Sequence, residues 1–506
     1  MEQIQNEKKI LNHLVGDLSQ AVVEGSAILP AGMPEMARIL MVTPYAEVAS
    51  AEPDQGRVAV EGNLTLLICY LCADGLTHSF ESTSVFRSTV EVEGAQPGMG
   101  CVVEALPSAV EYTLGSGRDL SVHAIVDLCC VLEEDVPLLA LAFEDAPQNM
   151  SALPAEAHFT RSARRMSLTG EIQGSVPIPS GIAPVERVLF ASGFAEIKRT
   201  MFDGETLGIE GELKLNVLYS TGEDSAPVSQ IYGSLEFSEV VPADGVDGDI
   251  EVRAQVGRIQ CTLDDAGEAL EISALCKMAV SCRRRFGFVG IKDAYAEHCR
   301  TDLEYQRINT MDKCLMKTGT NAVRERMQLG EEAVPARILC CNLTPGVCRA
   351  YDQGGMLVME GMLGCQVVYV GYDGAINTVS GEVPVRLEEP AVDLAGATQL
   401  TAQIWADQVQ TVPAGDEVEV RALVQYRCDG YRPAAMDLVT VIRQDEEEAA
   451  ERTPSGIIVY FIQPGDTLWD VAKRYRINQD VILAQNPGVE DQLVAGQKLL
   501  LISRPV

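Results

Sequence analysis

Apolar and polar residues alternate along many short stretches of this chain, with the period of a half-buried β-strand. Between residues 212 and 219, mostly polar positions alternate with the apolar residues Leu213, Leu215, Val217 and Tyr219. The segment 417–421 alternates in the same way. Successive side chains of a strand point to opposite faces, so one face packs on a core while the other meets water. The pattern therefore predicts a mainly β protein.

One unit recurs three times along the chain at a nearly constant spacing of 149 and 150 residues. In each copy an Arg stands 23 residues before a Glu-Gly pair, and an alternating segment begins 58 to 60 residues after it. The three copies begin with EGNLTLLICYLCADG at Glu61, EGELKLNVLYSTGED at Glu210 and EGMLGCQVVYVGYDG at Glu360. The upstream Arg residues are Arg38, Arg187 and Arg337. Three anchors in register predict a triplicated domain with one topology.

Short alternating strands separated by turns favour antiparallel β-sandwich or barrel-like units. Asp74-Gly75 and Asp373-Gly374 suit tight turns that need positive φ. A spacing of about 150 residues exceeds that of a solenoid repeat, so we expect each copy to hold its own core. The expected units are residues 21–135, 165–285 and 320–442, after an N-terminal leader of residues 1–20. Residues 136–164 and 286–319 are expected linkers, with helical stretches at 144–165 and 293–307.

Residues 443–456 form an acidic segment closed by Pro454, Ser455 and Gly456, which is typical of a solvated linker. A different module follows at residues 457–503. Its pattern predicts a strand ending at Ile462, a helix capped by Thr467 and Asp470, a second helix from Asn478 to Asn486, and a last strand at 498–502. The order β-α-α-β describes a compact two-layer module.

The sequences QPGDTLWDVAKRY, NP and AGQKLLLI of this module resemble a LysM domain. The resemblance implies a shallow groove for N-acetylglucosamine-containing glycans such as peptidoglycan. Carried over residue by residue, the groove comprises Gly465, Asp466, Thr467 and Leu468 on one side and Asn486, Pro487 and Gly488 on the other. Gly465, Asp466 and Thr467 also suit a turn and a helix cap without any ligand. Trp469 beside them is either a core residue or an exposed anchor.

Three acidic β-repeats followed by one LysM domain resemble the SPOCS-domain spore-coat morphogenetic proteins of the SipL type. The resemblance implies a protein of the mother-cell cytoplasm that coats the forespore surface. It also implies docking on the ATPase polymer of the coat's basement layer and on other coat proteins. Because the chain has one LysM domain, we expect its groove to serve as a protein dock that binds glycan weakly.

The net charge of the chain and its lack of recognisable targeting segments exclude further classes of function. The chain has 506 residues and a formal net charge of −34, which argues against nucleic-acid binding because phosphate neutralisation needs clustered Lys and Arg. No signal peptide is recognisable, and the longest apolar run, 136–143, is too short for a transmembrane segment. The fifteen Cys have irregular spacing, which predicts reduced thiols in a cytoplasm.

No catalytic or metal-binding motif stands out, so we expect no enzyme activity, no metal and no cofactor. The G-x-S-x-G, H-E-x-x-H, P-loop and G-x-G-x-x-G patterns are missing. Cys69 and Cys72 form a lone C-x-x-C in a predicted strand, where alternation places the two thiols on opposite faces.

Three features of the sequence are each compatible with two interpretations. The basic islands Arg161, Arg164, Arg165 and Arg283, Arg284, Arg285 form either a dock for an acidic partner or solvated charge. The repeated Glu residues form either a shared ligand site or the start of a strand after a bend, where Gly relieves the backbone. For the whole protein, the alternative to a coat morphogenesis protein is a peptidoglycan-binding cell-wall protein anchored by its LysM domain.

Overall fold

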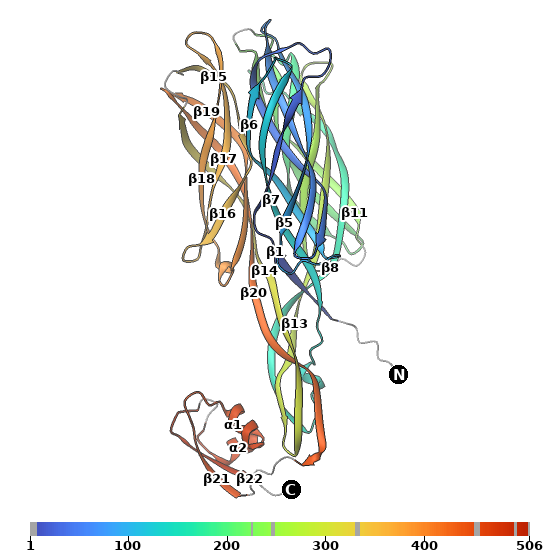
Figure 1. The fold of residues 1–506 in the computed structure, drawn as a ribbon, viewed down its shortest axis with the longest axis vertical. Coiled ribbons are helices and arrows are strands. Elements are labelled where there is room, and N and C mark those ends of the chain that lie inside the picture. Colours follow the sequence, from blue (N-terminus) through green and yellow to red (C-terminus); the bar gives the residue numbers. More distant parts are fainter. Residues whose placement is uncertain are drawn as a thin grey trace.

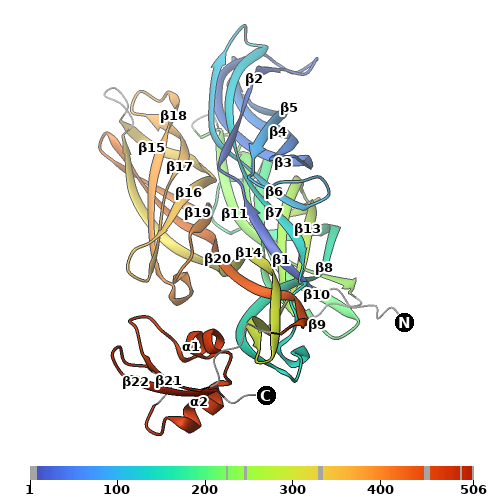
Figure 2. The same ribbon diagram turned by 60° about the horizontal axis from the view of Figure 1, so that its bottom comes forward.

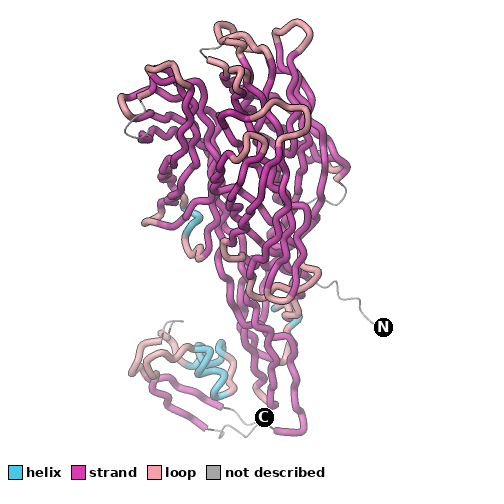
Figure 3. Tube along the Cα trace, turned by 45° about the horizontal axis from the view of Figure 1, so that its top comes forward, coloured by secondary structure: helices cyan, strands magenta, loops and turns pink. Residues whose placement is uncertain are grey.

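The computed structural model describes residues 8–223, 226–243, 248–328, 334–449, 456–489 and 493–503. Strands dominate these residues, and the α-helices lie in the C-terminal module (Figures 1 and 3). The expectation of a mainly β fold followed by a small βααβ module is confirmed. No helix among the described residues is long and apolar enough to span a membrane.

Three units of six strand positions make up residues 9–449. In unit one, two short strands share the first position: β1 (Lys9–Val15), β2 (Ser19–Ile28), β3 (Met36–Asp54), β4 (Arg57–Cys72), β5 (Thr77–Glu91), β6 (Gly100–Leu114) and β7 (Asp119–Pro137). Unit two contains β8 (Met150–Pro177), β9 (Arg187–Phe202), β10 (Thr206–Ser220), β11 (Val228–Pro242), β12 (Asp249–Leu263) and β13 (Ala269–Ala296). Unit three contains β14 (Cys299–Gln328), β15 (Pro335–Thr344), β16 (Gly346–Asp352), β17 (Met356–Gly371), β18 (Ile376–Pro390), β19 (Gln399–Ala414) and β20 (Glu417–Ala449). Two 3₁₀ turns, η1 (Phe143–Asp145) and η2 (Val392–Leu394), lie between strands.

Each unit pairs its strands in the same antiparallel way. The second, third and fourth strands form one sheet, as in β3-β4-β5 and β9-β10-β11, and the fifth, sixth and first form another, as in β12-β13-β8. In unit three β15 and β16 share the second position, and β16 also pairs with β19, which joins the two sheets. The repeated segments beginning at Glu61, Glu210 and Glu360 all lie in the third strand. Equivalent sequence anchors therefore occupy equivalent strands.

Each unit has its own buried core, as expected, and a fourth core joins the three units. Leu64 and Val126 belong to the core of unit one, Leu213 and Ile272 to that of unit two. The fourth core, which we call the junction core, takes residues from the second and third strands of every unit and from β11. Its buried members are Leu40, Met41, Leu67, Cys69, Leu189, Phe190, Leu218, Val228, Cys340 and Val368. Burial of this apolar surface depends on all three units being together.

Hydrogen bonds around the junction core follow one another in a ring. A fourth-strand side chain of each unit bonds the second-strand backbone of the next. These contacts are Ser79 Oγ to Leu189 O (2.6 Å), Cys341 N to Gln230 Oε1 (2.6 Å) and Thr378 Oγ1 to Leu40 O (3.1 Å). The repeated Arg residues reinforce the ring, because Arg38 donates to the carbonyl of Ile376 and Arg187 to the equivalent carbonyl of Thr77. The arrangement is a pseudo-trimer within one chain.

Several segments expected to be linkers, a leader or helices are strands instead. Residues 9–15 of the expected leader pair with β7. The expected linkers 136–164 and 286–319 contain much of β8, β13 and β14, which extend as antiparallel ribbons below the sandwiches. Residues 443–449 of the expected acidic linker belong to β20, and 450–455 lie outside the described residues. The helical interpretation of 144–165 and 293–307 is wrong, because residues 150–165 belong to β8, 293–296 to β13 and 299–307 to β14. Phe159, Phe288 and Ile308 pack into a core between these ribbons. We call residues 150–162, 284–296, 299–312 and 432–449 the stalk.

Candidate functional site

The C-terminal module packs two helices on a two-stranded sheet at the foot of the stalk. It consists of β21 (Gly456–Phe461), α1 (Leu468–Tyr475), α2 (Gln479–Gln485) and β22 (Lys498–Ser503). Thr467 and Asp470 form the expected capping box, since the Thr467 side chain accepts from the Asp470 backbone and the Asp470 carboxylate accepts from the Thr467 backbone. Asn478 caps α2, as expected. The βααβ order and both caps are confirmed.

The first loop of the expected groove uses its polar side chains internally. Asp466 Oδ2 accepts hydrogen bonds from Tyr460 Oη (2.6 Å) and from the Gln463 backbone (2.8 Å). These hydrogen bonds, Tyr460 first, lower the pKa of Asp466 and keep it ionised. Thr467 is occupied by the helix cap, while Gly465 is exposed with φ +92°. Backbone groups around Gly465 are therefore what this loop offers to a ligand.

Leu468 does not line an open groove with its side chain. It is buried in the core of the module with Val471, Ile482 and Leu501. Its place in the first turn of α1 turns the side chain inward, because the apolar residues at 468, 471 and 472 share one helix face. The resemblance to LysM domains assigned Leu468 to the ligand groove. In this structure only the backbone of Leu468, and not its side chain, can belong to such a groove.

In the second loop, Asn486 is a structural residue and its two neighbours are exposed. Asn486 Nδ2 donates to the carbonyls of Ile482 and Leu500, each at 2.7 Å, and its Oδ1 accepts from the Leu500 backbone at 2.6 Å. The amide thus ties the end of α2 to β22. Pro487 and Gly488 are exposed. Together with Gly465, they form the accessible part of the two loops.

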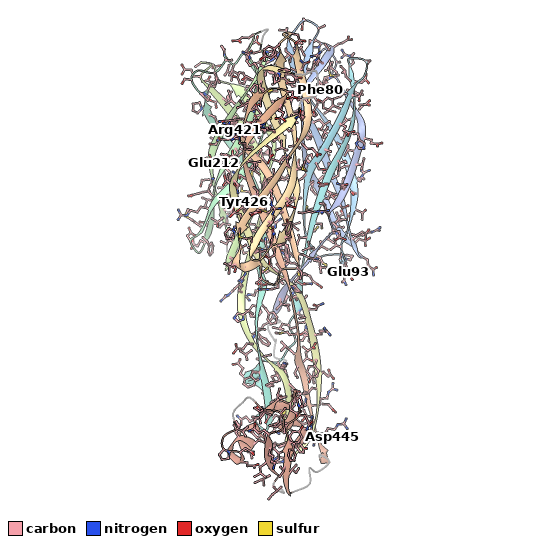
Figure 4. The ribbon with its side chains drawn as sticks, turned by 90° about the vertical axis from the view of Figure 1, so that its left-hand side faces the viewer. Phe80, Glu93, Glu212, Arg421, Tyr426 and Asp445 are labelled. Atoms are coloured by element: carbon pink, nitrogen blue, oxygen red, sulfur yellow. The ribbon has the colours of Figure 1, made fainter. Side chains whose placement is uncertain are left out.

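Helix α1 docks the module on the stalk through Asp293 of β13. Trp469 Nε1 donates to Asp293 Oδ2 at 2.8 Å, and Lys473 Nζ lies 2.6 Å from Asp293 Oδ1. Tyr295 packs edge-on against Trp469, with ring centroids 5.1 Å apart, and donates from Oη to the carbonyl of Ile477 at 2.8 Å. Figures 1 and 2 both place the module beside the lower end of the stalk, and Figure 4 labels Asp445 of β20 at that lower end.

Trp469 is therefore buried against another part of the same chain, with 7% of its surface exposed. Burying an indole requires a partner for its N–H, and Asp293 supplies it. Sequence reasoning missed Asp293 and Tyr295 because they lie in a stretch expected to be a linker. The regular spacing of Phe286 and Phe288 upstream is the signal of a strand that could have pointed to them.

Between the three units lies a cavity of about 600 Å³, lined by residues of all three. Its walls come mainly from the second strands, such as β3 and β9, and from the fifth strands β6, β12 and β19. Apolar residues such as Pro44, Leu106 and Trp405 contribute much of the lining. Glu104, Arg253 and Gln403, which occupy the same position in the fifth strand of each unit, meet at one end of it.

A network of ion pairs, which we call the axial ion cluster, joins the units at this end. Its members are Glu104, Glu133, Arg165, Glu251, Arg253, Arg283, Lys313, Arg427 and Asp429. Most of these side chains are largely buried. Charges removed from water need close partners, and the cluster supplies them from all three units.

Charges in the cluster hold its carboxylates ionised. Burial raises the pKa of Glu251, but the charges of Arg253 and Lys313 outweigh burial and bring it far below its usual range. For Glu133, too, burial is outweighed, by contact with His13 and by the charges of Arg283 and Arg165. The pKa of Asp429 is lowered by Arg427 and Arg253 in the same way.

Neither interpretation of the basic islands, a dock for an acidic partner or solvated charge, describes all of their members. Arg165 and Arg283 both bind Glu133, at 2.6 and 2.8 Å, so these members are internal ion-pair residues. Arg161 and Arg285 lie on paired stalk strands. The side chain of Arg164 lies outside the described part of the structure.

The repeated Glu residues do not converge on a ligand site. Glu61 pairs with Arg87 and Glu360 with Arg386, each across the third and fourth strands of its own unit and at the surface. The interpretation that Glu-Gly begins a strand after a bend is wrong, since the pair lies inside a continuous strand. A Cβ at Gly211 would stand 2.4 Å from the Phe237 ring, so Gly leaves room for a cross-strand aromatic ring.

Among the described residues, no group of three or more Cys, His, Asp or Glu has the geometry of a metal site. Cys69 lies in the junction core and Cys72 in the core of unit one, so their thiols point to opposite faces, as predicted. No disulfide joins any of the fifteen Cys, all of which are described residues.

Comparison with protein families matches two kinds of domain in this chain. The SipL SPOCS domain matches residues 35–114 and 184–264, and the LysM domain matches residues 460–501. The SPOCS matches cover the second to fifth strands of units one and two. No curated protein and no solved structure gives a match. SPOCS domains of this family imply a sporulation context, and a LysM domain suggests glycan binding. The chain therefore carries a SipL SPOCS domain match in each of units one and two and a LysM domain at residues 460–501.

Proposed function

We propose that this protein is a non-enzymatic spore-coat morphogenesis protein that encases the forespore from the mother-cell cytoplasm. It docks coat material on the forespore surface through protein contacts of its SPOCS units and its LysM domain. The observation that carries the proposal is the combination of SPOCS and LysM domains in one chain. The elongated shape supports it, because the LysM domain sits at one end and the sandwiches at the other (Figure 1).

Unit three is, in this proposal, a third SPOCS domain. Its strands pair in the same order as those of units one and two, and its Arg and Glu-Gly anchors stand at the same positions. It also contributes Cys340 and Val368 to the junction core. A binding partner therefore contacts the three SPOCS units as a single packed assembly.

The proposed partner of the LysM domain is the ATPase of the coat's basement layer, with other coat proteins as further partners. The two groove loops support a protein partner, because Asp466, Thr467 and Asn486 already use their polar side chains within the domain. What stays accessible is backbone and the apolar surface of Pro487, which can receive a loop or strand of a partner.

The second candidate function is binding of peptidoglycan or another N-acetylglucosamine-containing glycan. The LysM match itself favours it. Exposed backbone N–H and C=O groups around Gly465 and Gly488 can bond acetamido groups without a charged ligand.

The two functions are separated by binding measurements on the purified full-length protein with two matched variants. Pro487→Lys places a charged side chain on the accessible loop, and Val481→Lys makes the same change on an exposed position of α2. Each protein is tested for binding to the purified coat ATPase polymer and to purified peptidoglycan sacculi.

The proposal expects the native protein to bind the ATPase polymer, Pro487→Lys to lose at least tenfold in affinity, and Val481→Lys to bind like the native protein. Tight binding to sacculi with no binding to the polymer contradicts the proposal and supports the glycan function. Release of muropeptides from the sacculi contradicts the proposed absence of enzymatic activity.

A further inference from the structure

Among the described residues, two pairs of thiols have their sulfurs within 4 Å of each other. Cys101 Sγ on β6 lies 3.9 Å from Cys130 Sγ on β7, and Cys341 Sγ on β15 lies 3.7 Å from Cys365 Sγ on β17. In the first pair, Cys101 stands opposite Leu132, two residues from Cys130, so both thiols point to one face of the sheet. The two pairs have similar separations in similar cross-strand positions.

The pairs differ in their access to solvent. Cys101 is partly exposed and lines the cavity between the units, next to Val102 and Glu104. Its partner Cys130 is 1% exposed. In the other pair both Cys341 and Cys365 are 3% exposed. Of these four Cys residues Cys101 is the most exposed, although it also packs against the core of unit one, so it is the one that a small oxidant can meet.

The two thiols of the first pair also differ in acidity. The hydrogen bond with Cys130 lowers the pKa of Cys101, although burial acts in the opposite direction. The same hydrogen bond and burial raise the pKa of Cys130. A thiolate is the reactive form of Cys, so the accessible sulfur is also the more reactive one.

We propose that Cys101 and Cys130 form a peroxide-responsive dithiol that closes to an intramolecular disulfide. The Cys101 thiolate attacks hydrogen peroxide, an S–O bond forms, the O–O bond breaks, and the hydroxide that leaves takes up a proton as water. The Cys130 thiol, giving up its proton, then attacks the sulfenic sulfur, an S–S bond forms, and the S–O oxygen leaves as a second water. Two thiols and one peroxide thus yield one disulfide and two waters.

Closure is compatible with the surrounding strands. The sulfurs approach from 3.9 Å to about 2.05 Å, the length of a disulfide bond. Among the described strands, β6 pairs with β7 alone, and it already has a register irregularity between Pro107 and Ala109, so it can adjust. The disulfide joins β6 to β7 between Glu104 and Glu133, two acidic members of the axial ion cluster.

The test is oxidation of reduced full-length protein by hydrogen peroxide, followed by alkylation of the remaining thiols and mass spectrometry of tryptic peptides without reduction. Trypsin cleaves after Arg118, which separates the peptide of Cys101 from that of Cys130. Fragmentation distinguishes Cys130 from its neighbour Cys129. The expected product is a Cys101–Cys130 disulfide that forms at least tenfold faster than any Cys341–Cys365 disulfide.

Two variants test the order of the steps. Cys130→Ser is expected to stop at a Cys101 sulfenic acid that dimedone traps, and Cys101→Ser is expected to leave Cys130 reduced. The proposal is overturned if the native dithiol stays reduced while the urea-unfolded protein oxidises, or if Cys341–Cys365 oxidises equally fast. Both outcomes are read on the wild-type protein, so neither depends on the folding of a variant.

Discussion

The guanidinium of Arg253 donates to the carboxylate of Glu104 at 2.9 Å, although the two residues occupy the same position in units two and one. The third residue at this position, Gln403, also donates to Glu104. Equivalent positions of a threefold arrangement meet at its axis, where three identical charges would repel one another. The three units instead have Glu, Arg and Gln at this position. The contact between the units is therefore attractive and holds the pseudo-trimer together.

Replacing Arg253 by Met is expected to destabilise the protein by about 3 kcal/mol, since it leaves Glu104, Glu251 and Asp429 short of a buried partner. Chemical denaturation followed by circular dichroism measures the change. Arg421→Met is the control, because Arg421 is half exposed and its partner Glu419, although buried, keeps a second ion pair with Arg324, so we expect a loss of about 1 kcal/mol or less. Equal losses for the two variants would contradict a stabilising role of the cluster.

Acid is expected to destabilise the protein below about pH 4.5, the range of ordinary carboxyl pKa values. The folded-state pKa values of Glu133, Glu251 and Asp429 are lowered, so the folded state binds protons less readily than the unfolded state. Their contribution is present above the ordinary pKa and is lost as the pH falls towards the folded-state values. Thermal denaturation between pH 7 and pH 3 tests this. A midpoint that stays constant down to pH 3 would count against it.

Asp293→Ala is expected to release the LysM domain from the stalk, because it removes the partner of both Trp469 and Lys473. Loss of hydrogen bonds to a charged group amounts to about 2 kcal/mol, or roughly 30-fold in the docking equilibrium. Small-angle X-ray scattering should show a larger radius of gyration. Asp302→Ala, at an exposed ion pair elsewhere on the stalk, should leave it unchanged. An unchanged radius in both variants would refute the docking role of Asp293.

Gly211→Ala is expected to destabilise the protein by about 1–3 kcal/mol through overpacking. The added Cβ would lie 2.4 Å from Phe237 and 2.8 Å from the backbone oxygen of Glu196, which cannot move aside as a side chain can. Gly287→Ala, also within a strand, meets nothing within 4 Å and should be neutral or slightly stabilising. The melting temperatures of the two variants provide the comparison. A neutral Gly211→Ala would show that the strand accommodates the Cβ.

Local patterns were sufficient to predict the triplication, the β class and the LysM module. Leu213, Leu215 and Val217 alternate with polar residues because they lie on the buried face of one strand. A pattern of this kind is contained in a single short segment of the sequence. The caps at Thr467 and Asn478 are equally local, because a helix end is satisfied by residues within one turn.

The stalk, the docking of Trp469 and the axial ion cluster were decided by tertiary structure. Asp293 and Trp469 are 176 residues apart, and neither carries a local sign of the other. Arg283 belongs to a basic island in the sequence, yet its charge is neutralised by Glu133 and Glu251, far away along the chain. Alternation in a strand encodes which face is buried, but it does not encode what covers that face, because the covering residues come from another part of the fold.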